Sequence, residues 1–349
     1  MMLARRMRIP WVLILTVNAS AAPLPLMPMP EKVILSTGTL PIDASFRVAV
    51  TGYSDARLQG AIQRFTARVA RQTGIPLSLS AAKGVTMQVN CGGRGSKYPA
   101  LGEDESYRLD VSSTGARLSA RMVSGVLRGL ETFAQLIARG PDGFQVPAVR
   151  IEDRPRFPWR GLMVDVSHHW MPAAVVERNL DVMAAVKLNV FHWHLSDDQG
   201  FRVESKRYPK LQQEGSDGNF YTQADVRRIV AYASERGIRV IPEFDMPGHT
   251  SAWFVGYPEL ASAPGPYRIE RRWGVFQPTM DPTREETYVF LDGLIGEMAA
   301  LFPDPYFHIG GDEVEGSQWR LASRHLPARM SWPPATRFRL ISMGVWKSF

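Results

Sequence analysis

From residue 159 onward, short apolar runs of strand length alternate with longer segments whose apolar residues recur at helical spacing. The runs of strand length are 161–166, 188–195, 238–244 and 306–309. Repeated strand and helix units predict parallel strands with right-handed crossovers, in an open doubly wound sheet or in part of a (β/α)8 barrel. The helical spacing is marked by Val176, Leu180 and Met183, by Val226, Ile229, Val230 and Ala233, and by Leu291, Leu294, Ile295 and Met298.

Two of these helices begin with the pattern of a capping box, in which a Thr is followed three residues later by an acidic residue. The pairs are Thr222 with Asp225 and Thr283 with Glu286.

No glycine-rich phosphate loop follows the first strand. Its absence disfavours a nucleotide-binding sheet.

Residues 22–155 have the pattern of a smaller α+β domain. A proline-rich linker opens it, and Asp153-Arg-Pro-Arg-Phe-Pro158 closes it, because two prolines impose extended structure. Short strand-like runs occur at 32–35, 46–50, 85–89, 107–111 and 116–120. Two helices are predicted from Leu58, Ile62, Phe65 and Val69, and from Leu127, Leu130, Ala134 and Ile137. We expect this domain to be non-catalytic.

The N-terminus has the order of a secretory signal peptide. Arginines within residues 5–8 precede the apolar run 9–17, and Ala19-Ser20-Ala21 offers a cleavage site before Ala22. The apolar run is too short to span a bilayer. A buried N-terminal helix is the alternative. We expect removal of residues 1–21, export to the periplasm or the extracellular space, and no stable membrane span.

Composition and charge narrow the function. With 349 residues and 45% hydrophobic content, the chain can form one large domain and a smaller one. Of the net charge of +7, six positive charges lie after Trp319, which leaves +1 for the rest. No basic stripe supports nucleic-acid binding. Cys91 is the only cysteine, which excludes an internal disulfide and a cysteine-based metal site.

Polar side chains follow the carboxyl end of each predicted strand after residue 159. In a barrel this rim carries the active site, so the pattern indicates an enzyme. His192 and His194 alternate along a strand and could instead be core histidines. A metal cluster is a rival use of the same side chains. The rim residues are Asp165, His168, His169, His192, His194, Asp197, Asp198, Glu243, Asp245, His249, Asp312 and Glu313.

The pair Asp312 and Glu313 is the leading candidate for the chemistry. Gly310 and Gly311 precede it and let the backbone turn and approach a ligand closely. Because one carboxylate can raise the pKa of its neighbour, such a pair is suited to acid and base catalysis on an acetal or ester. A helix N-terminus, where acidic residues complement the dipole, is the alternative.

Four segments resemble those of glycoside hydrolase family 20, the β-N-acetylhexosaminidases. They are Arg160-Gly-Leu-Met-Val-Asp165, Asn189-Val-Phe-His-Trp-His-Leu-Ser-Asp197-Asp198-Gln-Gly, Pro242-Glu-Phe-Asp-Met-Pro-Gly-His249-Thr and His308-Ile-Gly-Gly-Asp312-Glu313. The resemblance implies a small non-catalytic α+β domain followed, over 156–319, by the first half of a TIM (β/α)8 barrel, about four β/α units.

The resemblance also implies an activity. The chain would remove terminal N-acetyl-hexosamine residues from glycans or chitin oligosaccharides, as an exo-acting, retaining enzyme with no metal or other cofactor. By resemblance, Glu313 is the general acid/base and Asp312 stabilises the substrate's acetamido group. Asp197 and His249 match positions that bind the terminal sugar and support the catalytic pair.

The chain departs from the family pattern in two places. The family usually has Asp-x-Ser-Arg-His after strand one, and this chain has Asp165-Val-Ser-His168-His169. We expect His168 to contact the sugar in place of the arginine, with fewer donors and no charge near neutral pH.

The second departure is the tail, residues 320–349, which has six basic and no acidic side chains and contains no strand-helix unit. We interpret it as the product of a truncated or frameshifted gene and expect little activity, since the second half of the barrel would complete the pocket. A degenerate carbohydrate-binding protein and a metal-dependent hydrolase are the alternatives.

Overall fold

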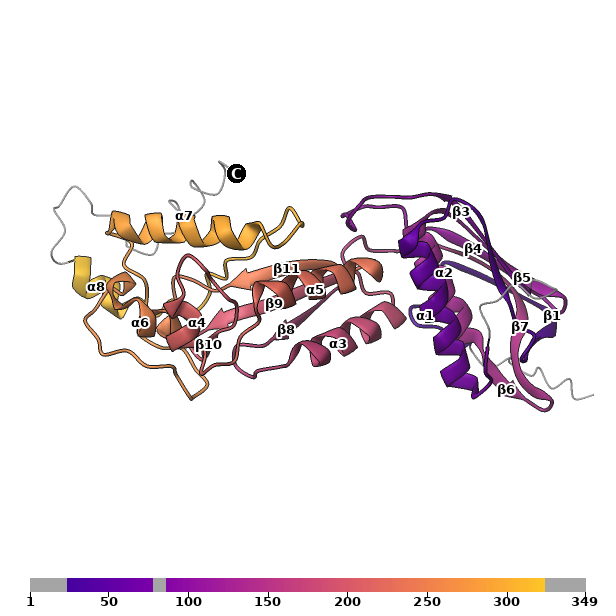
Figure 1. Ribbon diagram of the computed structural model, residues 1–349, viewed down its shortest axis with the longest axis horizontal. Coiled ribbons are helices and arrows are strands. Elements are labelled where there is room, and N and C mark those ends of the chain that lie inside the picture. Colours follow the sequence, from indigo (N-terminus) through magenta and orange to yellow (C-terminus); the bar gives the residue numbers. More distant parts are fainter. Residues whose placement is uncertain (1–23, 78–85, 324–349) are drawn as a thin grey trace, which may run out of the picture.

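The computed structural model describes residues 24–77 and 86–323. The predicted signal peptide and residues 324–349 of the predicted tail lie outside the described residues. Figure 1 shows two bodies joined end to end: the N-terminal domain in indigo and purple, and a second body that runs from magenta to yellow. No helix within the described ranges is long and apolar enough to cross a membrane.

The N-terminal domain is a sheet with two helices on one face (Figure 1). The strand order is β1-β7-β4-β5-β3-β2, and β6 pairs with β7. All five predicted strands and both helices are confirmed, whereas β6 and β7 were not predicted. The bounds are β1 Lys32–Ile42, β2 Val48–Gly52, α1 Ala56–Thr73, β3 Met87–Gly93, β4 Tyr107–Ser112, β5 Gly115–Met122, α2 Val123–Leu136, β6 Ala138–Gly140 and β7 Gly143–Asp153.

The sequence explains where α1 begins, where it ends and which side it buries. The side chain of Asp55 accepts a hydrogen bond from the Leu58 amide at 2.8 Å, which caps the N-terminus. Gly74 ends the helix at φ 72°, a conformation that glycine adopts without steric cost. The apolar stripe packs Phe65 against Phe46 and Phe133, with ring centroids 5.8–6.4 Å apart.

The second body contains three parallel strands in the order β8-β9-β11, with the short β10 antiparallel to β9. The predicted fourth strand joins the edge of β11 as a single parallel bridge between Glu243 and His308. This is the predicted first half of a (β/α)8 barrel. Bounds are β8 Gly161–Asp165, α3 Ala173–Ala185, β9 Val190–Asp197, β10 Gly200–Phe201, α4 Lys210–Gly215, α5 Gln223–Glu235, β11 Arg239–Phe244, α6 Ser251–Gly256, η1 Pro258–Leu260, α7 Glu285–Ala299 and α8 Ser317–Ser323.

The order of the strands decides which of them are buried. The central strands β9 and β11 are almost wholly buried, as predicted. The prediction of burial is wrong for β8, where Met163 is 54% exposed, and for Tyr306, which is 47% exposed. Both lie on outer strands of this sheet, so within the described residues each has a neighbouring strand on one side only.

The two predicted capping boxes have different outcomes. At α5 the Thr222 and Asp225 side chains cap each other's backbone amides, which confirms the prediction. At α7 the prediction is wrong, because the helix begins at Glu285 with Arg284 in the N-cap position. The Thr283 hydroxyl instead donates to Asp281 Oδ1 at 2.7 Å.

A buried polar network joins the two bodies. Glu105 Oε2 accepts hydrogen bonds from Arg128 Nε at 2.5 Å and Arg160 Nη2 at 2.6 Å. Burial opposes the charged carboxylate of Glu105, but the two guanidinium groups hold its pKa below the usual value. Lys187 Nζ similarly donates to Asp153 Oδ2 at 3.1 Å. Because buried charges are tolerated when paired, this network fixes the position of one body on the other.

The network also decides which end of the barrel strands is free. Arg160 directly precedes β8, and Lys187 lies just before β9. Arg128 Nη2 donates to the carbonyl of Gly237, just before β11, at 2.8 Å. The N-terminal domain is therefore attached at the amino ends of the strands. Their carboxyl ends point away from it (Figure 1).

Candidate active site

Asp197, at the end of β9, is the centre of a cluster of rim side chains. Its Oδ1 lies 3.1 Å from His249 Nδ1, and its Oδ2 lies 3.1 Å from His194 Nε2. Burial opposes ionisation of Asp197, but the two histidines hold its pKa well below the usual range. Burial opposes the charge of both imidazoles, but Asp197 and Asp198 raise the pKa of His249 to about 11, and Asp197 and Glu243 raise the pKa of His194 to about 10. Both histidines are therefore charged at neutral pH.

His249 links Asp197 to Glu313. The second ring nitrogen of His249, Nε2, lies 3.4 Å from Glu313 Oε2. The Glu313 side chain is 55% exposed, so it faces solvent while one of its oxygens lies near the imidazolium. Both His249, with φ 53°, and Glu313, with φ 48°, adopt the left-handed backbone region. This conformation is costly for residues other than glycine and is concentrated at functional sites.

Asp312 lies beside a buried carboxyl group, Asp245, at the end of β11. The amide of Gly311 donates to Asp245 Oδ1 at 3.1 Å. Gly310 has φ 66°, and a Cβ at this position would lie 1.7 Å from Asp245 Oδ1. Only glycine fits there. The predicted sharp turn and close approach are both present, and the group approached is a protein carboxyl.

Burial, reinforced by the charge of Asp312, raises the pKa of Asp245 to about 7. A carboxyl whose pKa is raised on folding stabilises the fold below its unfolded pKa, near 4, and loses that contribution as pH rises through 7. We therefore expect Asp245→Asn, which keeps the acceptor for Gly311, to be increasingly stabilising relative to the native protein between pH 5 and pH 8. Thermal unfolding at several pH values would measure it, and a difference in Tm that is independent of pH would contradict it.

Glu243, near the end of β11, contacts three histidines. Its Oε2 lies 2.6 Å from His192 Nε2 and 2.9 Å from His194 Nδ1, and its Oε1 lies 2.9 Å from His308 Nδ1. Burial opposes the charged form, but the three imidazoles hold the pKa of Glu243 far below its usual range. The register of β9 on β11, which pairs His194 with Glu243, creates this cluster.

The contacts of Glu243 bear on the interpretation of the rim histidines. His192, His194 and His308 are close enough to carboxylates to form groups of possible metal ligands. In the structure, their nitrogens meet carboxylate oxygens directly at 2.6–2.9 Å, so the opposite charges are already paired as ion pairs. We therefore interpret the cluster as a network of ion pairs, and the metal site remains the alternative use of the same side chains.

His168 lies at the end of β8 and is tied to the same cluster. Its Nδ1 is 2.5 Å from Asp165 Oδ2 and 3.8 Å from Asp197 Oδ2. Burial opposes its charge, but these carboxylates raise the pKa of His168. The expectation that His168 loses its charge near neutral pH is therefore corrected, because the imidazole keeps its charge to a higher pH. His169, by contrast, is exposed.

The match to known families is decisive for classification. The family described as "Glycosyl hydrolase family 20, catalytic domain" matches residues 157–333, and "Glycosyl hydrolase family 20, domain 2" matches residues 24–154. The chain belongs to glycosyl hydrolase family 20. The resemblance of the four strand-end segments to this family is thereby confirmed.

Curated and solved members of family 20 are similar to the chain over part of their length. The bovine β-hexosaminidase subunit alpha is 45% identical over 228 residues, which cover 64% of this chain and 42% of that protein. A Flavobacterium johnsoniae chitobiase structure has a TM-score of 0.82 at 44% identity, over 91% of this chain and 48% of that one. A Vibrio harveyi exo-β-N-acetylglucosaminidase solved with N-acetylglucosamine has a TM-score of 0.70 at 30% identity, over 86% and 50%. The chain spans about half the length of these relatives.

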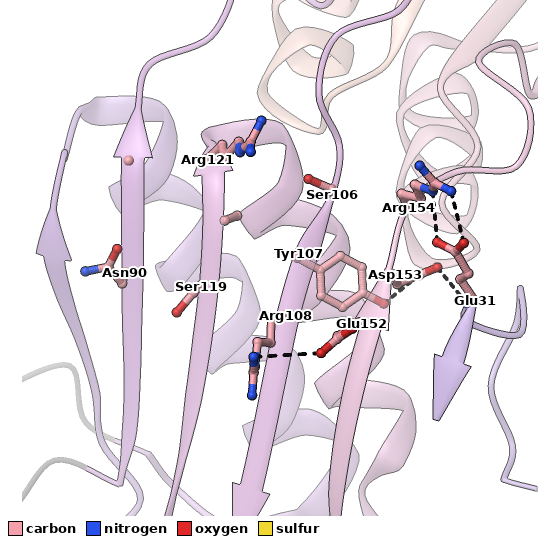
Figure 2. A pocket seen from close by; sticks show the side chains of 12 residues that line it. Glu31, Asn90, Ser106, Tyr107, Arg108, Ser119, Arg121, Glu152, Asp153 and Arg154 are labelled. Carbon is pink, nitrogen blue, oxygen red and sulfur yellow. Dashed lines mark hydrogen bonds and ion pairs between the residues drawn. The ribbon is translucent and has the colours of Figure 1, made fainter. Parts of the chain in front are cut away.

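A hollow of about 550 Å³ lies on the family 20 domain 2 sheet. Figure 2 shows Arg154 beside Glu31 and Arg108 beside Glu152. Tyr107 OH donates to Asp153 Oδ2 at 2.7 Å, and Arg154 Nε donates to a Glu31 oxygen at 2.9 Å. Within each pair, the donor and the acceptor satisfy each other's hydrogen-bonding groups. Asp153 also belongs to the network that joins the two bodies. We interpret the hollow as part of that structural network.

Proposed function

We propose that this family 20 chain carries the catalytic residues of an exo-acting β-N-acetylhexosaminidase, which hydrolyses terminal N-acetyl-hexosamine residues with retention of configuration; little activity is expected of the chain without the second half of the barrel. The observation that carries the proposal is the arrangement of Asp312 and Glu313 directly after the Gly310-Gly311 turn, with Glu313 Oε2 3.4 Å from His249 Nε2. The names of its relatives, β-hexosaminidases and chitobiases, support the same activity.

In the proposed first step, the acetamido oxygen of the substrate attacks the anomeric carbon, and the bond to the leaving oxygen breaks. Glu313 gives its proton to that oxygen. Its exposed position lets it reach a leaving group, while His249 Nε2 lies 3.4 Å from its Oε2. Asp312 stabilises the positive oxazolinium ion that forms.

In the second step, Glu313 takes a proton from water, which attacks the anomeric carbon and reopens the oxazoline ring. Two inversions at this carbon give net retention. Asp197 holds His249 charged and in place through both steps. The scheme uses only side chains of the chain and the substrate's own acetamido group, and requires no cofactor.

The test uses a version of the chain with a completed barrel and compares two chromogenic aryl β-glycosides that differ only at carbon 2. We expect kcat/KM for the 2-acetamido-2-deoxy-glucoside to exceed that for the glucoside by at least about 1000-fold, because an intramolecular nucleophile has a high effective concentration. Similar rates on the two glycosides would contradict substrate assistance. Binding of N-acetylglucosamine without hydrolysis would instead favour a non-catalytic carbohydrate-binding protein.

A further inference from the structure

Trp273 is an exposed tryptophan held beside the proposed sugar-binding residues. Its side chain is 80% exposed, more than any other large hydrophobic residue in the described part of the chain. Its ring centroid lies 4.3 Å from that of His168, with the two planes inclined by 46°. Sequence reasoning missed Trp273 because the surrounding segment shows neither helical nor strand periodicity.

The loop that carries Trp273 is anchored by the three residues that directly precede this tryptophan. The Glu270 amide donates to the carbonyl of Asp198 at 3.0 Å, and Gln199 Nε2 donates to the carbonyl of Arg272 at 2.9 Å. Both anchors come from the residues that directly follow Asp197. In addition, the Arg271 guanidinium binds Asp217 through two hydrogen bonds of 2.6 and 2.8 Å. These bonds explain why the indole remains beside His168 without being buried.

An exposed indole next to charged hydrogen-bonding groups matches the chemistry of a pyranose. Each sugar ring has faces of C–H groups, which pack on aromatic rings, and a rim of hydroxyls, which need donors and acceptors. Ligand sites combine apolar and aromatic walls with a few convergent polar groups in the same way. Tryptophan supplies a large, rigid contact surface with little conformational entropy to lose.

We propose that Trp273 is a sugar-binding residue that forms one wall of the site for the terminal N-acetyl-hexosamine. Its indole packs against a C–H face of that sugar, and His168 and Asp197 meet the hydroxyls at the edge. This inference rests on the proposed function. It adds an aromatic contact from the loop between α6 and α7, next to the residue that departs from the family pattern.

The test measures binding separately from catalysis. Glu313→Gln provides a background without turnover, and methyl 2-acetamido-2-deoxy-β-D-glucopyranoside is the ligand in isothermal titration calorimetry. In this background we expect Trp273→Ala to weaken binding about 10-fold, equal to about 1.4 kcal/mol at 25 °C. Trp273→Phe should restore most of the affinity, because it keeps an aromatic face. Tm should remain unchanged in both variants, since the indole is exposed.

Trp159→Ala is the matched control. Trp159 is also exposed, at 44%, but it precedes β8 and so lies at the opposite end of the strand from His168. We expect it to leave the affinity unchanged. Affinity within twofold of the background for Trp273→Ala would overturn the proposal. A lowered Tm together with failure of Trp273→Phe to restore binding would overturn it in favour of a structural role. No binding by the Glu313→Gln protein itself would reject the proposed function and, with it, the role of Trp273.

Discussion

In a version of the chain with a completed barrel, Glu313→Gln is expected to lower kcat/KM for a chitin disaccharide by about 1000-fold, but much less for a 2,4-dinitrophenyl glycoside of the same sugar. A positioned general acid contributes about 100- to 10,000-fold when the leaving group needs a proton. Dinitrophenolate leaves without one. Because kcat/KM reports the steps up to the first irreversible one, it isolates protonation of the leaving group from the later activation of water.

Glu315→Gln is the control for this prediction. Glu315 is an exposed carboxylate two residues away, whose Oε2 accepts a hydrogen bond from the Ser317 amide at 2.8 Å. The substitution removes a negative charge from the same segment and should leave both rates within a factor of about two, since exposed charges interact weakly. Equal losses on the two substrates for Glu313→Gln would mean that Glu313 is not the proton donor.

The parts of the fold that could be predicted are those set by local periodicity. Helices α1, α2, α3, α5 and α7 each bury an apolar stripe, and β9 and β11 are short, almost wholly buried strands rich in apolar residues. Strand β7 was missed because Pro147 and flanking charges interrupt its pattern. The second capping box failed because a local competitor, Asp281, binds the Thr283 side chain.

The candidate site was predictable at the level of position, but its pairings were not. Strand direction alone brings the carboxyl ends of parallel strands to one rim, so Asp197 and Glu243 could be placed together. Which histidine meets which carboxylate depends on the register of β9 on β11. The pattern of residues within each strand does not predict that register. The pKa of His168 likewise depends on Asp165 and Asp197 at distances that only the fold sets.

Glu243→Gln is expected to lower the free energy of unfolding by about 3–5 kcal/mol near pH 6, because it removes a carboxylate partner of the buried, charged imidazole of His194. The carboxylate faces His192, His194 and His308, and its own exposure is 5%. Glu214→Gln, the same change at an exposed position in α4, should cost less than about 0.5 kcal/mol. Urea denaturation would measure both. A loss below about 1 kcal/mol for Glu243→Gln would mean that the cluster does not stabilise the fold.

The loss of unfolding free energy in Glu243→Gln should also depend on pH, in a direction that follows from the pKa shifts of Glu243 and His194. The pKa of Glu243 is lowered on folding, so its contribution is present above its unfolded pKa, near 4.5, and is lost in acid. The pKa of His194 is raised to about 10, so its contribution is complete below its unfolded pKa, near 6.5, and is lost as pH rises toward 10. The two windows overlap between about pH 4.5 and 6.5, where the native cluster is most stabilising. The difference between the native protein and Glu243→Gln should therefore be larger at pH 6 than at pH 9.5. Equal differences at the two pH values would show that packing, and not charge, accounts for the stability of the cluster.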